Sequence, residues 1–170
     1  MKNVIVGHGQ DDDVVSEGKI LNRIIRASAQ GWEYECDQRH VEVPVQQLGL
    51  TGKKPIATPG VDESKFEVGN DAAPSLQLAT RYRALAARCN YIVVGRADAQ
   101  YAIKELCRDM AAPTELSWNR LVRLGRYFLG RPRAIVHFAW QPFASVVDIF
   151  TDANWAGCKT ARKSTSGGVA

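Results

Sequence analysis

The clearest hydrophobic pattern lies in the middle of the chain, where apolar residues recur every three or four positions. Leu78, Tyr82, Leu85, Cys89 and Ile92 follow one another at steps of four, three, four and three residues. Such steps place side chains on one face of a helix, because an α-helix turns once in about 3.6 residues. The sequence therefore predicts an amphipathic helix between Leu78 and Ile92.

Two more helices are predicted further along, each behind a residue that can cap it. Asp98 can accept hydrogen bonds from the first turn of one helix, and Thr114 can do the same for the next. The predicted apolar faces are Tyr101, Leu106 and Met110 in the first, and Trp118, Leu121, Val122, Phe128 and Leu129 in the second. Together with the preceding helix they predict a three-helix bundle.

Strand-like segments precede the helices. Residues 20–26 and 32–36 are rich in β-prone side chains and flank residues 27–31, which predicts a hairpin. Asp37 can then cap a short helical stretch. Its apolar residues are Val41, Val45 and Leu48. Pro44 lies inside this stretch and is expected to kink or shorten it, because proline cannot donate a backbone hydrogen bond.

Beyond residue 133 the pattern again becomes strand-like. Residues 134–140 and 145–152, joined across Pro142, predict an antiparallel pair of strands, and residues 164–169 predict a third strand. Alternation along the second strand would place four residues on one face. They are Val146, Asp148, Phe150 and Asp152.

The predicted fold class is α+β, in four segments. Residues 1–50 hold the β-hairpin and the short helix, and residues 75–133 hold the three-helix bundle. Residues 134–170 hold two to three antiparallel strands. Residues 51–74 are rich in Gly, Pro, Lys, Asp and Glu and are predicted to be a linker.

The composition, with 45% hydrophobic and 24% charged residues, is that of an ordinary globular protein. The sequence contains neither an apolar run of about 18 residues nor an apolar N-terminal segment of the signal-peptide kind. We therefore expect an intracellular protein, cytoplasmic or nuclear and not secreted, with no membrane partner. The four cysteines form no Cys-x-x-Cys pair, so we expect reduced and mostly buried thiols.

Charge is unevenly distributed along the chain, whose net charge is +4. Residues 74–133 carry 11 basic and 4 acidic groups, whereas residues 1–73 carry 8 basic and 12 acidic groups. A basic segment attracts polyanions, because binding releases the counterions of the nucleic acid. The charge therefore makes nucleic acid the natural partner to consider for the helical segment, although a basic helical face is also common on proteins with no such partner.

The basic residues of the last predicted helix recur at helical spacing. Arg120, Arg123 and Arg126 are three residues apart, so their guanidinium groups would lie along one side of the helix. Arg131 and Arg133 would add to its end. This side is either an edge that follows phosphates or a solvated flank, and the sequence leaves both interpretations open.

Two acidic features are candidates for metal-dependent chemistry. Asp152 follows an apolar strand and precedes small residues and a turn, which is how many metal-dependent nucleases place their first carboxylate. The run from Asp11 to Asp13 lies among glycines, and we interpret it as a solvated acidic loop.

Four stretches of the chain together resemble the polymerase region of copia-type retrotransposon polyproteins. They are YRALAARCNY, GRADAQYAIKELCRDM, PTELSWNRLVRLGRYFLGRP and TDANWAGCKTARKSTSGG. The upstream stretches ILNRIIR, YECDQRHVEV and KKPIATPG fit the same family in the same order. The resemblance covers most of the chain, from about Lys19 onward.

This resemblance implies the end of a reverse transcriptase joined to the start of a ribonuclease H. Residues 20–37 would be the last hairpin of the palm, which grips the primer end. Residues 82–130 would be the helical thumb, whose first helix follows the minor groove of the template–primer duplex. Residues 134–170 would begin an incomplete ribonuclease H-like sheet. Arg81 and Arg88 would then join Arg120, Arg123 and Arg126 as nucleic-acid-binding residues.

The same resemblance assigns Asp152 as the first metal-binding carboxylate of ribonuclease H. Mg²⁺ is implied for the complete parent enzyme, which uses two ions held by about four carboxylates, and no cofactor is expected in this chain. The paired aspartates of the polymerase are missing upstream of residue 20. The chain also has Ala87 where the family usually has glycine, Ala97 for proline and Asn154 for aspartate.

The expected function is therefore that of a Pol polyprotein fragment without catalysis of its own, which retains a capacity to contact an RNA–DNA or DNA duplex. The remainder of a Pol polyprotein is a further expected partner. Two alternatives are a helical protein-interaction module without a nucleic-acid role, and an active metal-dependent nuclease that uses Asp152.

Overall fold

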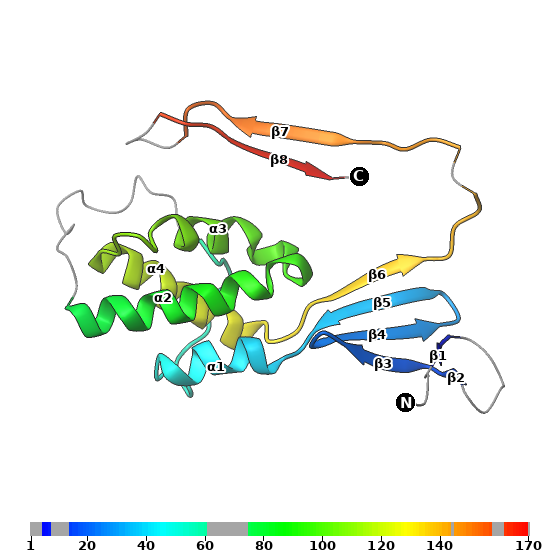
Figure 1. Ribbon diagram of the computed structural model, residues 1–170, viewed down its shortest axis with the longest axis horizontal. Coiled ribbons are helices and arrows are strands. Elements are labelled where there is room, and N and C mark those ends of the chain that lie inside the picture. The colour runs from blue at the N-terminus through cyan, green and yellow to red at the C-terminus, as the bar shows by residue number, and fades with distance from the viewer. Residues whose placement is uncertain (1–4, 8–13, 61–74, 144, 158–161, 170) are drawn as a thin grey trace. The chain divides into compact units, whose positions relative to one another are not determined.

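The computed structural model describes residues 5–7, 14–60, 75–143, 145–157 and 162–169. The chain divides into two compact units, residues 1–139 and residues 140–170. The first unit combines a four-stranded antiparallel sheet with a group of helices, and the second contains a two-stranded ribbon (Figure 1). These elements confirm the predicted α+β class.

The four-stranded sheet has the order β3-β4-β5-β6. Its strands are β3 (Glu17–Ile20), β4 (Arg23–Ser28), β5 (Gly31–Cys36) and β6 (Ile135–Ala139). The short strands β1 (Ile5–Val6) and β2 (Val14–Val15) pair with each other in parallel. The predicted hairpin is confirmed as β4 and β5.

A second hairpin, which the sequence pattern did not predict, joins β3 to β4. Its turn consists of Leu21 and Asn22, whose φ angles are 48° and 58°. Two successive positive φ angles are typical of the two-residue turn whose twist matches that of antiparallel strands. Ile20 therefore ends β3, and the next strand begins at Arg23.

The fourth strand, β6, corrects the predicted pairing of residues 134–140 with residues 145–152. It pairs instead with β5, from Glu35 opposite Ile135 to Gly31 opposite Ala139. At Gly31 the strands are so close that a Cβ atom would lie 2.0 Å from the backbone oxygen of Phe138. The compact units thus differ from the predicted segments, since β6 belongs to the first unit.

In the part of the first unit that the structure describes, the helical elements are four α-helices and two short 3₁₀ turns. The α-helices are α1 (Arg39–Gln47), α2 (Leu76–Tyr91), α3 (Gln100–Arg108) and α4 (Glu115–Gly130), and the 3₁₀ turns are η2 (Val93–Gly95) and η3 (Ala97–Ala99). The three predicted helices are confirmed as α2, α3 and α4. The short α1 contains Pro44 and ends one turn later, as expected where the His40 carbonyl loses its intrahelical donor.

The three predicted caps had different outcomes. The Asp37 carboxylate accepts from the Arg39 backbone N–H at 3.0 Å, but Gln38 is the N-cap residue of α1. Thr114 does cap α4, because its hydroxyl oxygen accepts a hydrogen bond from the Ser117 backbone N–H. The Ser117 hydroxyl oxygen in turn accepts one from the Thr114 backbone N–H. Asp98 does not cap α3 but lies in η3, where its carboxylate binds Arg96 and Tyr127. Tyr101, expected on the apolar face of α3, is 59% exposed; Ile103 and Leu106 form that face.

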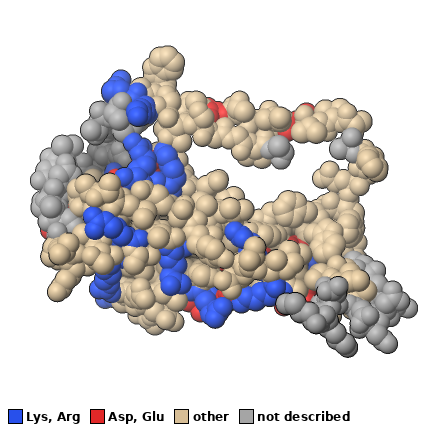
Figure 2. All heavy atoms as spheres, viewed as in Figure 1, with Lys and Arg blue, Asp and Glu red and all other residues tan. Residues whose placement is uncertain are grey.

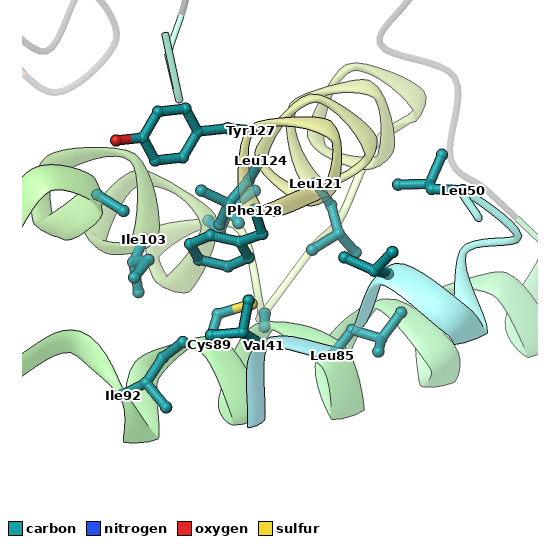
Figure 3. Close-up of a cluster of buried hydrophobic side chains, with 14 of the residues drawn as sticks. Val41, Leu50, Leu85, Cys89, Ile92, Ile103, Leu121, Leu124, Tyr127 and Phe128 are labelled. Carbon is teal, nitrogen blue, oxygen red and sulfur yellow. The ribbon is translucent and has the colours of Figure 1, made fainter. Parts of the chain in front are cut away.

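The hydrophobic core lies among the helices (Figure 3). It includes Val41 of α1, Leu85 and Cys89 of α2, Ile103 of α3, and Leu121, Leu124 and Phe128 of α4. Gly125 of α4 permits a close approach of the chain after α1, since a Cβ there would lie 2.6 Å from the Leu50 side chain. Cys36 and Cys89 are buried free thiols and Cys107 is partly buried, as predicted for these three.

The second unit contains β7 (Phe150–Asn154) and β8 (Thr165–Val169), which pair antiparallel. The strand predicted over residues 164–169 is confirmed as β8. The strand predicted over residues 145–152 begins only at Phe150, so the expected face with Val146 and Asp148 is not formed. Among the described residues, no strand forms backbone hydrogen bonds in a sheet with the apolar run 145–149.

The core can be tested with two leucines of α2, because Leu85 is 1% exposed and Leu76 is 80% exposed. We expect Leu85→Ala to lower the free energy of unfolding by about 2–5 kcal/mol, since it removes apolar contacts and leaves a cavity. Leu76→Ala should change it by less than about 0.5 kcal/mol. Urea denaturation followed by circular dichroism measures both, and equal effects would contradict the assigned core.

Candidate nucleic-acid interface

Residues 54–60, which we call the strap, run along one side of α4. The Arg126 Nε donates to the Lys54 carbonyl at 2.9 Å, and the Ile56 backbone N–H donates to the Arg126 carbonyl at 3.4 Å. Arg123 donates from Nε to the Gly60 carbonyl at 3.0 Å and from Nη2 to Thr58 Oγ1 at 2.7 Å. This part of the segment predicted to be a linker is therefore attached to α4.

Packing also holds the strap against the helix. Ile56 is partly buried against the hydrophobic core. Gly130, at the end of α4, lies so close to Pro55 that a Cβ atom there would be 2.8 Å from the proline Cβ. Leu50, just before the strap, is 5% exposed. The strap is thus anchored by apolar contacts, and its hydrogen bonds with Arg123 and Arg126 lie at the surface.

The partners of Arg123 and Arg126 are neutral carbonyl and hydroxyl oxygen atoms, which do not offset the positive charge of the guanidinium groups as a carboxylate would. Within the described ranges neither arginine forms an ion pair, whereas Arg120 does. Lys53 and Lys54 are also exposed, and the Lys54 carbonyl is the acceptor for Arg126. Figure 2 shows Lys and Arg over the helices on the face drawn, with few Asp or Glu among them. The strap thus positions the guanidinium groups of Arg123 and Arg126 without offsetting their positive charge.

The other three predicted arginines have different surroundings. Arg120 pairs with Asp109 at 3.1 Å, which offsets its charge. The Arg81 guanidinium lies 5.7 Å from the centroid of the Trp118 ring of α4, so this contact brings Arg81 to the same helix. Arg88 instead lies 3.4 Å from the His40 ring nitrogen. The structure thus brings together Arg123 and Arg126, and separates Arg88 from them.

A buried carboxylate on β5 was missed by the sequence pattern. Glu35 is 1% exposed and binds Arg133 through both oxygens, at 2.6 and 2.8 Å. It also accepts from Arg26 at 2.8 Å and from Gln38 at 3.4 Å. Arg133, expected to extend the basic edge, is therefore committed to an ion pair. The signal available in the sequence was an acidic residue between Tyr34 and Cys36 in a β-prone run, where a buried acid needs a basic partner.

These bonds stabilise the ionised form of Glu35. The Arg133 guanidinium, assisted by Arg26 and Gln38, lowers the pKa of the Glu35 carboxyl from 4.5 to about 2, although burial opposes the shift. Nearby, Asp37 pairs with Arg39 and Lys19, and these partners hold the pKa of its carboxyl well below the usual value. Both acids therefore support the fold as anions.

Asp152, the predicted catalytic and metal-binding carboxylate, lies on β7 opposite Gly167. It is exposed, and its Oδ1 accepts from the neighbouring Ala153 backbone N–H at 2.8 Å. Among the described residues no three His, Cys, Asp or Glu side chains gather as metal ligands would. The run from Asp11 to Asp13 lies outside the described residues, so the structure does not bear on it.

Asn154, one of the departures from the family pattern, supports the ribbon of β7 and β8. Its side-chain oxygen accepts from the Thr165 backbone N–H across the ribbon. None of the helices in the described ranges has the length and apolar character that a membrane crossing requires.

Comparison with known proteins identifies relatives among plant transposon polyproteins. Over 114 residues the chain is 32% identical to the retrovirus-related Pol polyprotein from transposon RE2 of Arabidopsis thaliana, covering 67% of this chain and 8% of that protein. Over 130 residues it is 31% identical to the corresponding polyprotein from transposon RE1, covering 76% of this chain and 9% of that protein.

A third relative is an uncharacterized mitochondrial protein of the same plant. It is 28% identical over 131 residues, which cover 76% of this chain and 52% of that protein. The chain thus spans less than a tenth of the two polyproteins and about half of the mitochondrial protein. No family model and no solved structure matches the chain.

The Glu35 ion pairs predict how stability depends on pH. Because the folded chain lowers the pKa of Glu35, their contribution is present in full above about pH 4.5 and is lost as the pH falls toward 2. We expect Glu35→Gln to lower the free energy of unfolding at pH 7 by about 2 kcal/mol, with solvent screening at the half-exposed Arg133 limiting the loss.

Denaturant titrations between pH 7 and pH 2 measure this effect. Below pH 4.5 the free energy of unfolding should fall less steeply in Glu35→Gln than in the unaltered chain. Part of the decline should remain, because Asp37 also has a lowered pKa. Glu33→Gln is the matched control on the same strand, since the Glu33 side chain is 30% exposed and lies 3.9 Å from Arg26. An equal loss in both variants would contradict the assigned role of Glu35.

Proposed function

This chain is homologous to part of copia-type retrotransposon Pol polyproteins, and we propose that it is the part that contacts the template–primer duplex. In this proposal, the helices and the sheet before residue 140 derive from the end of a reverse transcriptase, including its thumb. Residues 140–170 derive from the start of a ribonuclease H. The rest of a Pol polyprotein is then the natural protein partner.

The observation that carries this proposal is the charged edge of α4. Arg123 and Arg126 are one helical turn apart, and both are held by neutral oxygens at the surface. Guanidinium groups bind phosphate oxygens more strongly than neutral acceptors, because the hydrogen bonds are charge-assisted. A duplex backbone can therefore replace the strap oxygens as the partner without breaking an existing ion pair.

The remaining predicted arginines have smaller roles in this proposal. Arg81 lies next to α4 through Trp118 and can extend the edge toward α2. Arg120 contributes less, since a phosphate would have to compete with Asp109. Arg88, beside His40, serves the α1 side of α2. Contacts of this kind position a duplex by its phosphates and carry no base specificity.

We also propose that this chain does not cleave nucleic acid by itself. Residues 134–170 contain two acids, Asp148 and Asp152, and a two-metal nuclease needs more carboxylates than these. Asp152 already accepts a hydrogen bond from its neighbour's backbone. In this proposal Asp152 would take part in Mg²⁺ binding only together with carboxylates supplied by the remainder of a Pol polyprotein.

Binding to an RNA–DNA duplex tests the proposed interface. We expect the double variant Arg123→Ala/Arg126→Ala to bind on the order of tenfold more weakly than the unaltered chain at low salt, since two phosphate contacts are lost. The slope of log affinity against log salt concentration should become shallower by about two. Fluorescence anisotropy with a labelled duplex over a salt series measures both quantities.

The matched control is Lys104→Ala/Arg108→Ala on α3, which removes the same number of positive charges. Both residues pair with Glu105, at 2.6 and 3.2 Å, so they are not expected to bind phosphate. Its salt slope should stay close to that of the unaltered chain. Equal losses in the two double variants would show that net charge, and not the α4 edge, binds the duplex.

A further inference from the structure

We infer that Thr58 is a phosphorylation site whose phosphate would be held by Arg123 and would close the basic edge of α4 to nucleic acid. The modification site stands on the geometry and the sequence of the strap. Its effect on duplex binding rests on the proposed function.

The surroundings of the Thr58 hydroxyl suit such a modification. Thr58 is exposed, in a stretch that is neither helix nor strand. Its Oγ1 accepts from Arg123 Nη2 at 2.7 Å and donates to the Gly60 carbonyl at 3.3 Å. The Arg123 guanidinium group is therefore already in place beside the hydroxyl, without a competing carboxylate among the described residues.

The sequence around Thr58 supplies the recognition feature. Thr58 is followed by Pro59, and this is the only Ser-Pro or Thr-Pro pair in the chain. Proline-directed protein kinases require such a pair in an extended, accessible segment. The strap meets the requirement of access, because Thr58 is exposed and its hydrogen bond with Arg123 lies at the surface, while Ile56 packs on the core.

The reaction transfers the γ-phosphoryl group of ATP, bound to such a kinase, to Thr58. The bond between Oγ1 and the γ-phosphorus forms, and the bond from that phosphorus to the bridging oxygen breaks, which releases ADP. The hydroxyl proton passes to the catalytic base of the kinase. The phosphate group on Thr58 then carries a charge of about −1.5 to −2 near pH 7.

This charge changes the partner of Arg123. A neutral hydroxyl acceptor becomes a phosphate, which forms charge-assisted hydrogen bonds with the guanidinium. The strap is then bound more firmly to α4, and Arg123 is no longer available to a duplex phosphate. The added negative charge also repels the duplex backbone from Arg126, the next residue of the same edge.

Kinase treatment of the full chain tests the site directly. With ATP and a proline-directed Ser/Thr kinase, we expect mass spectrometry to locate one phosphate, on Thr58. Thr58→Ala should abolish the modification, and so should Pro59→Ala, which leaves the hydroxyl in place. Absence of phosphate from Thr58 in the unaltered chain, or unchanged modification of Pro59→Ala, would overturn the proposal.

The contact with Arg123 has a separate readout that does not involve nucleic acid. In a ³¹P NMR titration, the second pKa of the phosphothreonine should lie below its usual value of about 6, and Arg123→Ala should restore that value. The variant Arg83→Ala is the control, because Arg83 of α2 binds the Met110 and Ala111 carbonyls after α3 and no residue of the strap. A titration that Arg123→Ala leaves unchanged would overturn the contact.

Duplex binding then separates this inference from the proposed function. The phosphorylated chain should bind an RNA–DNA duplex at least as weakly as Arg123→Ala, and further substitution of Arg123 should add little. Binding that phosphorylation leaves unchanged would overturn the switch. If the unmodified chain binds no duplex at all, the proposed function and the switch fail together, while the NMR titration still decides the phosphate contact.

Discussion

The hydrogen bonds and ion pairs of the buried Glu35 carboxylate are the interactions on which the first unit most depends. The carboxylate receives hydrogen bonds from Arg26 of β4, from Gln38 before α1 and from Arg133 after α4. A buried carboxylate is costly without such partners, and losing one of them leaves an uncompensated charge. The same group of atoms therefore fixes the neighbouring strand, the start of one helix and the exit from another.

A second set of contacts joins the sheet to the helices near the end of α2. Gly95 allows the chain to pass directly over Cys36, since a Cβ there would lie 2.2 Å from the Cys36 sulfur. Arg96, only 1% exposed, binds Asp98 and the Arg131 carbonyl and lies 4.6 Å from the Phe128 ring centroid. These contacts hold the end of α4 in place, and in the proposed function they position its basic edge.

Features that depend on neighbours in sequence could be predicted, and those that depend on distant partners could not. The helical steps of α2, the cap of Thr114 and the hairpin of β4 and β5 are local properties. The partner of β6 is not, because a period of two identifies a strand without naming its neighbour. The ion pair that fixes β6 joins residues 98 positions apart. Likewise, the spacing of Arg120, Arg123 and Arg126 is symmetrical, and only the folded chain distinguishes the neutralised arginine from the other two.

The pairing of β6 with β5 has a consequence for how the chain folds. The sheet receives its last strand from a segment that follows helices α1 to α4 in the sequence. During synthesis one edge of β5 stays unpaired until residue 139 has left the ribosome. An unpaired strand edge can pair with other chains. Closure between distant segments is also slow, because the intervening loop must first lose its freedom. Once α1 to α4 have packed together, Arg133 is brought to Glu35, so the loop that must close before β6 can pair with β5 is effectively shorter.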